Sequence, residues 1–253
     1  KYQMILILSG LVIVFFYLIS YINEYLSFRE SFSLIKIFDK NNAISFSTDI
    51  DEKYTIWTGL LGGFFLSLSY FGTDQSQVSR YINAKNIEES RIGLIFNAIL
   101  KIPLQFFILL IGTLLFVFYS LFTPPLNFND NLVSFQKEKN YELYQKIKEK
   151  TEILFEEKKV LINNNMSNQS SEIIKKNIEI DILRKNFEDD AIKNGFDYEK
   201  PESDFIFLHF ILNYLPVGLI GIIIALILSA AMSSTSAEIS ALSAISTIDI
   251  YKR

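Results

Sequence analysis

Four long apolar runs decide what this chain can fold into. They cover about 4–22, 54–73 and 93–119, and a fourth extends from Pro216 to about Glu238. A helix of about 20 residues crosses the ~30 Å hydrocarbon core of a bilayer, and a chain in lipid must satisfy its backbone hydrogen bonds internally. Half of the 253 residues are hydrophobic, and they are concentrated in blocks. We therefore predict an all-α integral membrane protein with four transmembrane helices.

The charges between these runs predict how the chain is threaded through the bilayer. The connection 74–92 carries three basic residues, Arg80, Lys85 and Arg91, and short loops rich in Lys and Arg remain on the cytoplasmic side. With four spans, this orientation puts both ends of the chain in the cytoplasm and residues 124–204 on the extracytoplasmic side. We predict a multi-pass protein of the inner (plasma) membrane, with the lipid bilayer as its surroundings.

Residues 124–204 are too hydrophilic to enter lipid, and their pattern is helical. Between Phe135 and Ile162, apolar residues recur at roughly helical spacing among Lys and Glu, and a second such pattern covers 172–194. Gly195 closes the second pattern, as glycine commonly does at helix ends. We predict a helical hairpin outside the membrane. The chain then divides into 1–123 with three transmembrane helices, 124–204 with the hairpin, and 205–253 with an interfacial segment and the fourth transmembrane helix.

Composition excludes several classes of function. The chain has no cysteine, which excludes disulfides and thiolate metal sites. It has one histidine, which cannot form a histidine zinc cluster and leaves one residue for a serine–histidine catalytic pair. Its formal charge of −4 is spread along the chain, without the basic patch that nucleic acid requires. No nucleophile, base and orienting residue group together. We expect no enzyme activity, no catalytic residue and no nucleic-acid partner.

Hydroxyl side chains follow one face of the fourth span. They step by four and three residues, which is helical spacing: Ser229, Ser233, Ser236, Ser240, Ser243 and Thr247. A neighbouring stripe consists of small side chains: Ala230, Ser234, Ala237, Ala241 and Ala244. Two interpretations stay open. The hydroxyls can supply oxygen ligands to a small hard cation, or both stripes can simply let helices pack closely.

The third span contains a lysine at membrane depth. Asn97, Lys101 and Gln105 lie four residues apart and share one helix face, with Pro103 in the same stretch. Lys101 lies about 12 Å along the helix from the start of the span, where a charge costs at least ~2.5 kcal/mol. Its ammonium group either extends back to the interface or points into a hydrated cavity. The aligned amides favour the cavity.

The second span is rich in glycine, which weakens a helix and permits close contact between helices. The glycines of this span are Gly59, Gly62, Gly63 and Gly72. Either the span is interrupted midway, as in transporters that bind their cargo with unwound backbone, or the glycines serve helix packing.

Three motifs resemble the signature of the sodium:solute symporter family, which includes the sodium/glucose cotransporters. They are YFGTDQSQVSRY with AK shortly after it (70–81, 84–85), GLIFNAILKIP (93–103), and LPVGL through AAMSS to DIYKR (215–219, 230–234, 249–253). They follow the order and spacing of the family and cover both halves of the chain except the insertion. The resemblance implies part of a LeuT-type inverted-repeat fold, with core helices five to eight, and a sodium-coupled symporter of a small solute.

The resemblance also implies a sodium site, with the sodium ion as cofactor. In the family's main site, the helix that matches the fourth span supplies a backbone carbonyl and two hydroxyls, which fall here at Ala230, Ser233 and Ser234. Some members have a second sodium site, but Ala237 stands where they have a serine ligand. We therefore predict one sodium site on this helix.

Solute-binding positions follow from the same resemblance. Residues that contact the solute in sugar-transporting members match Ser67, Tyr70, Phe71 and Lys101, and further candidates for lining the cavity are Asn97, Gln105 and Ser236. Ser67 and Phe71 replace an asparagine and a tryptophan of the sugar site, which disfavours a sugar.

The family's first core helix, which completes the main sodium site, has no match in this chain. We therefore expect a fragment that acts with the remainder of the transporter chain upstream of Lys1. Two alternatives stay open: the input domain of a transporter-like sensor kinase, and a remnant without transport activity.

Overall fold

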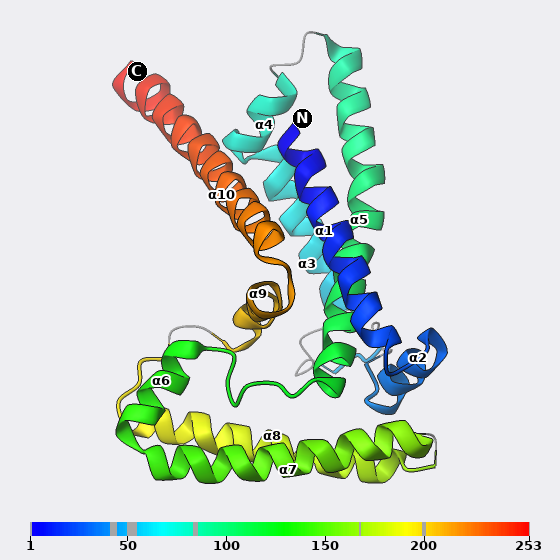
Figure 1. Cartoon of the computed structure of the whole chain (residues 1–253). Helices are drawn as coiled ribbons and strands as arrows, with labels where there is room; N and C mark the ends of the chain where they lie inside the picture. The colour runs from blue at the N-terminus through cyan, green and yellow to red at the C-terminus, as the bar shows by residue number, and fades with distance from the viewer. Residues whose placement is uncertain are drawn as a thin grey trace. The chain divides into compact units, whose positions relative to one another are not determined.

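The computed structural model describes residues 2–40, 45–49, 55–82, 86–166, 168–198 and 201–252, and these are mostly helical (Figure 1). The helices are α1 (Tyr2–Asn23), α2 (Phe28–Ile37), α3 (Ile56–Gly72), α4 (Gln75–Ile82), α5 (Ile87–Leu121), α6 (Asp130–Lys139), α7 (Tyr141–Asn165), α8 (Ser170–Lys193), α9 (Ser203–Tyr214) and α10 (Val217–Ile245), and a π-helical turn (Ser246–Tyr251) follows α10. The prediction of an all-α chain is confirmed for the described residues.

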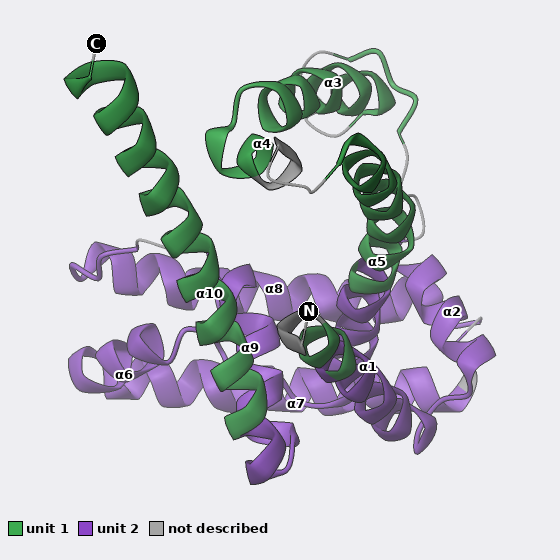
Figure 2. Ribbon diagram, turned by 90° about the horizontal axis from the view of Figure 1, so that it is seen from above, with its two compact units in different colours: residues 1–9, 42–108, 221–253 green, residues 10–41, 109–220 purple. Residues whose placement is uncertain are grey.

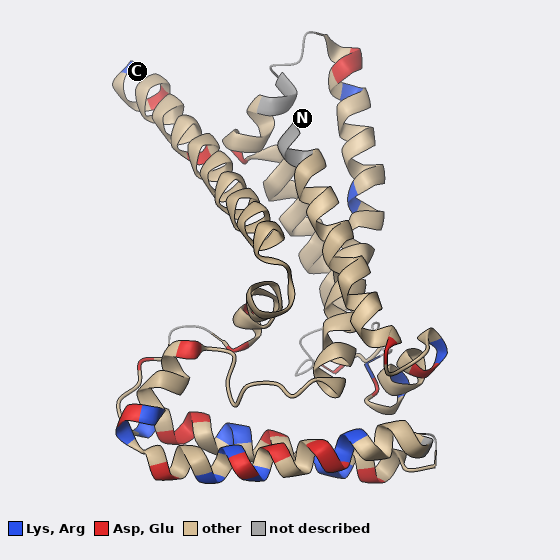
Figure 3. Ribbon diagram, in the orientation of Figure 1, with Lys and Arg blue, Asp and Glu red and all other residues tan. Residues whose placement is uncertain are grey.

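Three helices are long and apolar enough to cross a membrane. They cover Ile5–Asn23, Ile87–Leu121 and Val217–Tyr251. The second predicted span, at 54–73, is a shorter apolar helix, α3, which has 17 residues and is therefore about 26 Å long. Its start, predicted at 54, lies outside the described residues. Figure 3 shows the opposite composition on α6, α7 and α8, where Lys, Arg, Asp and Glu gather, whereas α1 and α10 are almost free of them.

The contacts divide the chain into two compact units (Figure 2). Unit 1 comprises 1–9, 42–108 and 221–253, and unit 2 comprises 10–41 and 109–220. These units are defined by contacts, whereas the predicted division into 1–123, 124–204 and 205–253 is defined by location in or outside the membrane. The predicted division therefore stays a prediction.

In unit 1, local signals explain where α3 and α4 begin. Thr55 forms a capping box with Thr58 at the start of α3, and the Asp74 carboxylate accepts the Ser76 N–H at the start of α4. The helix α3 runs from Ile56 to Gly72 without interruption. A methyl group added at Gly59, Gly62, Gly63 or Gly72 meets no atom within 4 Å. Within the described residues, these glycines therefore mark neither an unwound segment nor a close helix contact.

The helix α5 begins six residues earlier than the predicted span and continues through Pro103. Glu88 and Glu89 lie in its first turn, where negative charge stabilises the helix dipole. Proline removes one helical hydrogen bond, but the apolar residues on both sides keep the helix continuous. The helix has 35 residues and is thus about 52 Å long.

Unit 2 contains the hairpin of α7 and α8, which lie side by side in both views (Figures 1 and 2). Gly195 ends α8 with φ +96°, its N–H donates to the Ile192 carbonyl, and the Phe196 N–H donates to the Ala191 carbonyl. This is a Schellman motif, as the glycine predicts. The single helix expected from Phe135 is broken at Asn140, because this side chain caps α7 by accepting the Leu143 N–H.

Aromatic rings join the end of α5 to α1 and α9 within unit 2. The fully buried Phe118 contacts the rings of Tyr21, Phe210 and Tyr214. The Tyr21 hydroxyl also donates to the Tyr214 carbonyl at 3.0 Å. Such aromatic clusters bury a large area and fix geometry, so they hold the ends of the three helices together.

Candidate functional site

The predicted sodium ligands lie in one turn of α10, in unit 1. Ser233 and Ser234 are exposed, and Ala230 is half-buried. The Ala230 carbonyl lies inside the helix, but a carbonyl oxygen has a second lone pair, and each hydroxyl has two acceptor positions. This turn therefore offers oxygen ligands without a formal charge. Ser236, two residues after Ser234, is exposed, and Ala237 is half-buried.

A polar contact joins α4 to α10 just after this turn. The Ser76 hydroxyl lies 2.7 Å from Asp74 Oδ1 and 3.3 Å from Glu238 Oε1. Ser76 is 3% exposed. One hydroxyl has one proton, so the shorter contact to Asp74 is the stronger hydrogen bond, and the contact to Glu238 is weaker.

Small side chains of α10 face α4 beside this contact. They line a cavity of about 310 Å³ together with residues of α4: Gln75, Ser76, Ser79, Ala237, Ser240, Ala241 and Ala244. The last part of the predicted small-residue stripe thus lines a cavity next to α4. The sequence analysis used Glu238 only as the approximate end of the fourth span and did not predict its contact with Ser76. The Asp-x-Ser start of α4 was the available signal.

Two predicted solute-binding residues come together between α3 and α5, also in unit 1. Lys101 Nζ lies 5.2 Å from the centre of the Tyr70 ring, which is a cation–π contact. The Tyr70 and Phe71 rings lie 5.0 Å apart at 86°. Tyr70 is half-buried, whereas Lys101 and Phe71 are exposed. Lys101 therefore has an aromatic partner, which neither interpretation of its sequence position included.

The remaining predicted positions are not gathered with this pair. Ser67 lies one turn before Tyr70 on α3, and Asn97 and Gln105 lie one turn to either side of Lys101 on α5. All three are exposed. In the described part of the chain, no hydrogen bond joins their side chains to Lys101 or to one another. Their role in lining a cavity stays a prediction.

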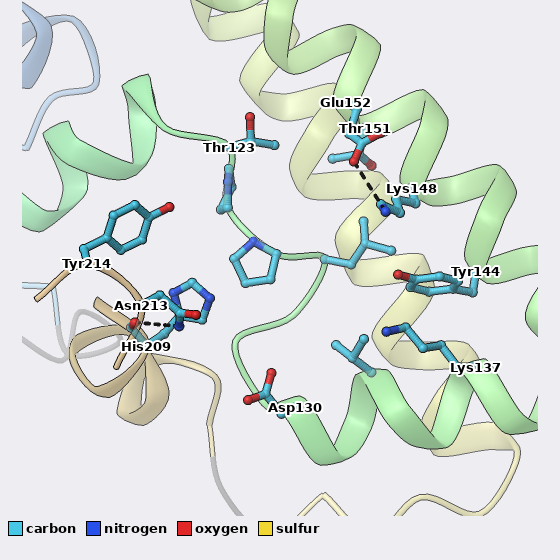
Figure 4. Close-up of a pocket in the computed structure, with 14 residues that line it drawn as sticks. Thr123, Asp130, Lys137, Tyr144, Lys148, Thr151, Glu152, His209, Asn213 and Tyr214 are labelled. Carbon is cyan, nitrogen blue, oxygen red and sulfur yellow. Dashed lines mark hydrogen bonds and ion pairs between the residues drawn. The ribbon is translucent and has the colours of Figure 1, made fainter. Parts of the chain in front are cut away.

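A polar cavity of about 470 Å³ lies in unit 2, among α6, α7, α9 and the loop after α5 (Figure 4). His209 lines it, and its Nδ1 lies 2.7 Å from the Tyr119 hydroxyl. Burial lowers the His209 pKa, and Asp130 opposes this shift. The imidazole is therefore neutral at pH 7. The buried Thr151 hydroxyl, which also lines the cavity, has no hydrogen-bond partner among the described residues.

Segments of the chain are similar to sodium-coupled transporters. The chain is 28% identical over 92 residues to the human sodium/iodide cotransporter, which covers 36% of this chain and 14% of that protein. It is 34% identical over 58 residues to the human sodium-coupled monocarboxylate transporter 1, covering 23% of this chain and 10% of that protein. It is 29% identical over 99 residues to the sodium/sialic acid symporter NanT of Aliivibrio fischeri, covering 37% and 20%.

No family model matches the chain, and no solved structure gives a significant match. The matched parts span between 10% and 20% of the length of the three relatives. These relatives are transporters rather than enzymes, and all three are sodium:solute symporters, the family that the three sequence motifs predict. In its motifs and in these matches, the chain is similar to members of the sodium:solute symporter family.

Proposed function

We propose that this chain is part of a sodium-coupled symporter for a small anionic solute, built on a LeuT-type inverted repeat. The observation that carries the proposal is the Lys101 ammonium above the Tyr70 ring, at two positions that the family resemblance assigns to the solute. The three relatives are named for iodide, a monocarboxylate and sialic acid, which are all anions at neutral pH. A lysine within a span is a natural partner for such a charge.

In this proposal, Ala230, Ser233 and Ser234 hold the sodium ion. Hard cations such as Ca²⁺ and Mg²⁺ take about six or more oxygen ligands, so three oxygens of α10 leave part of the coordination sphere open. Another helix of the complete transporter supplies the remaining ligands. Bound sodium favours the outward-open state that accepts the solute, and release of sodium to the cytoplasm follows release of the solute.

The proposed orientation has both ends of the chain in the cytoplasm and the hairpin of α7 and α8 on the extracytoplasmic side of the plasma membrane. The support is the basic connection between the second and third apolar helices. The charged surface of the hairpin agrees with an aqueous location (Figure 3).

The test uses the complete transporter that contains this chain, reconstituted in vesicles with and without an inward sodium gradient. Uptake is measured for iodide, a monocarboxylate, sialic acid and the neutral sugar glucose. We expect sodium to stimulate uptake of an anion, and Ser233→Ala to abolish that stimulation. Ser243→Ala is the matched control, because it removes an exposed hydroxyl from the same stripe outside the proposed site. Unchanged sodium dependence in Ser233→Ala contradicts the sodium site, and uptake of glucose alone contradicts the anionic solute.

A further inference from the structure

A second cavity in unit 2, of about 630 Å³, has one polar and one apolar side. The hairpin of α7 and α8 supplies the polar side, with Lys158, Asn177, Asp181 and Arg184, and Lys40 adds a further charge. The last turns of α5 and the first half of α9 supply apolar side chains: Leu115, Phe116, Ile206 and Phe207. This volume lies in the range of cavities that hold small molecules, about 300–1,000 Å³.

The cavity has more basic than acidic side chains in its lining. Lys158 is 3% exposed, and its Nζ donates to Asn177 Oδ1 at 3.1 Å. Among the described residues, neither Lys158 nor Lys40 forms an ion pair. A buried ammonium group whose only hydrogen-bond partner is neutral is costly, and an anion would offset that cost.

The other titratable groups of the cavity are one arginine and one aspartate, so the basic residues outnumber the single acid. Arg184 is paired with Glu202 and also donates to the Leu126 carbonyl. Asp181 accepts the Asn177 amide at 2.8 Å; burial raises its pKa, and the positive charges of Arg184, Lys158 and Lys40 oppose this shift. Lys158 and Lys40 thus remain the groups available to an external anion.

The apolar side belongs to the end of a helix that is long and apolar enough to cross a membrane. Leu115 and Phe116 lie within the last two turns of α5, which ends at Leu121. If the apolar part of α5 lies in the hydrocarbon core, its end and this cavity come close to the headgroups on that side. Its polar and apolar sides match a molecule that has an anionic head and a hydrocarbon tail.

We propose that this cavity binds an anionic phospholipid, with the phosphate on Lys158 and Lys40 and an acyl chain along α5. The attraction between a buried lysine and a lipid phosphate has the same physical basis as the binding of anionic headgroups in basic pockets between membrane helices. The Lys40 ammonium lies 5.8 Å from the centre of the Phe116 ring, which places the cation next to the apolar surface where the headgroup and the chain meet.

The test measures lipid retention by the full-length protein purified in detergent. Native mass spectrometry compares phosphatidylglycerol with phosphatidylcholine of the same chain length. We expect preferential retention of phosphatidylglycerol. Lys158→Gln and Lys40→Gln should each weaken it about fivefold, since one basic residue near a charged lipid surface contributes about 1 kcal/mol. Lys150→Gln, an exposed lysine of α7 outside the cavity, is the control with the same charge change.

Two kinds of result would overturn the proposal. One is a lack of selectivity, seen as equal retention of the two lipids or as a Lys40→Gln variant that behaves like Lys150→Gln. Because Lys40 is exposed, its replacement keeps the test valid even if Lys158→Gln fails to fold. The other is competition by soluble glycerol 3-phosphate as effective as that by the lipid, which would show an anion site without a lipid chain. Neither readout depends on transport.

Discussion

The Ser76 hydroxyl of α4 lies 3.3 Å from the Glu238 carboxylate of α10, although the two residues are 162 positions apart in the sequence. The contact lies one helical turn beyond Ser234, the last of the three proposed sodium ligands on α10. It is the long-range polar link that the described part of unit 1 offers between α10 and the segment after α3. In the proposed sodium cycle, this contact would couple a movement of α10 to α4.

Removing the contact between Ser76 and Glu238 should lower the free energy of unfolding, and the effects of changing the two residues should not be additive. We expect Ser76→Ala to lower the free energy of unfolding by about 1 kcal/mol or more, because the Asp74 and Glu238 contacts are both lost. Glu238→Gln keeps an acceptor oxygen and should cost less. Thermal unfolding of Ser76→Ala, Glu238→Ala and their double variant forms a double-mutant cycle, because Glu238→Ala removes the acceptor. Ser240→Ala, which lines the same cavity, is the control. Strict additivity in the cycle would show that the contact contributes nothing.

The pair of Lys101 and Tyr70 should set the affinity for an anionic solute. In the complete transporter, we expect Lys101→Gln to raise the KM for uptake about tenfold or more, because one charge-assisted contact to a solute contributes about 1.5–3 kcal/mol. Lys101→Arg keeps the charge and should retain part of the affinity. Tyr70→Phe keeps the ring that lies 5.2 Å from the ammonium, whereas Tyr70→Leu removes it. Tyr70→Leu should therefore be the weaker transporter. Equal KM values for Lys101→Gln and the parent would rule out the proposed contact.

The absence of cysteine makes the proposed orientation directly measurable. A single cysteine at Asn164, near the tip of the hairpin, should react with a membrane-impermeant maleimide applied to intact cells. A single cysteine at Arg91, in the first turns of α5, should react only after the membrane is permeabilised. Both positions are exposed. The reverse labelling pattern would show that the hairpin is cytoplasmic, opposite to the proposed orientation.

The end of α8 should be sensitive to a side chain at Gly195. Its φ of +96° lies in the region that L-residues avoid, at a cost of about 1–2 kcal/mol. We expect Gly195→Ala to lower the free energy of unfolding by about that amount. Gly93→Ala is the control, since Gly93 lies inside α5 with open space around an added methyl group. The control should be neutral or slightly stabilising, because alanine favours helix. Chemical unfolding of the full protein measures both.

Lys158 should give stability a dependence on alkaline pH. Burial lowers its pKa to about 8 from 10.5, so between these values the unfolded state binds the proton that the folded state has released. Stability therefore rises with pH across this window, by at most about 1.4 kcal/mol per pH unit. Other lysines and tyrosines also titrate there, so the measurement is the difference in unfolding free energy between the parent and Lys158→Met, both delipidated. We expect this difference to favour Lys158→Met at pH 7 and to shrink as pH rises. A difference that stays constant from pH 7 to 10.5 would show that Lys158 titrates normally.

The sequence located the helices well where the signal is local. The apolar runs at 4–22 and 93–119 lie within α1 and α5, and the glycine at 195 ends α8 as predicted. Hydropathy and capping depend on neighbouring residues, so they can be evaluated along the chain. The break at Asn140 was missed, although an Asn that caps a helix is also a local signal. Apolar residues before and after it keep a similar spacing, which hid the break.

The sequence by itself determined which segments are helical, which of them are apolar enough to enter a membrane, and which family the motifs resemble. Only the tertiary structure decided which side chains meet: Ser76 with Glu238, Lys101 with Tyr70, and Lys158 with Asn177 across the hairpin. The physical reason is the distance along the chain between the residues that interact. A helix forms through contacts three and four residues apart, which leave a periodic pattern in the sequence. Contacts between helices depend on how whole helix faces pack, and this packing leaves no periodic pattern in a single sequence.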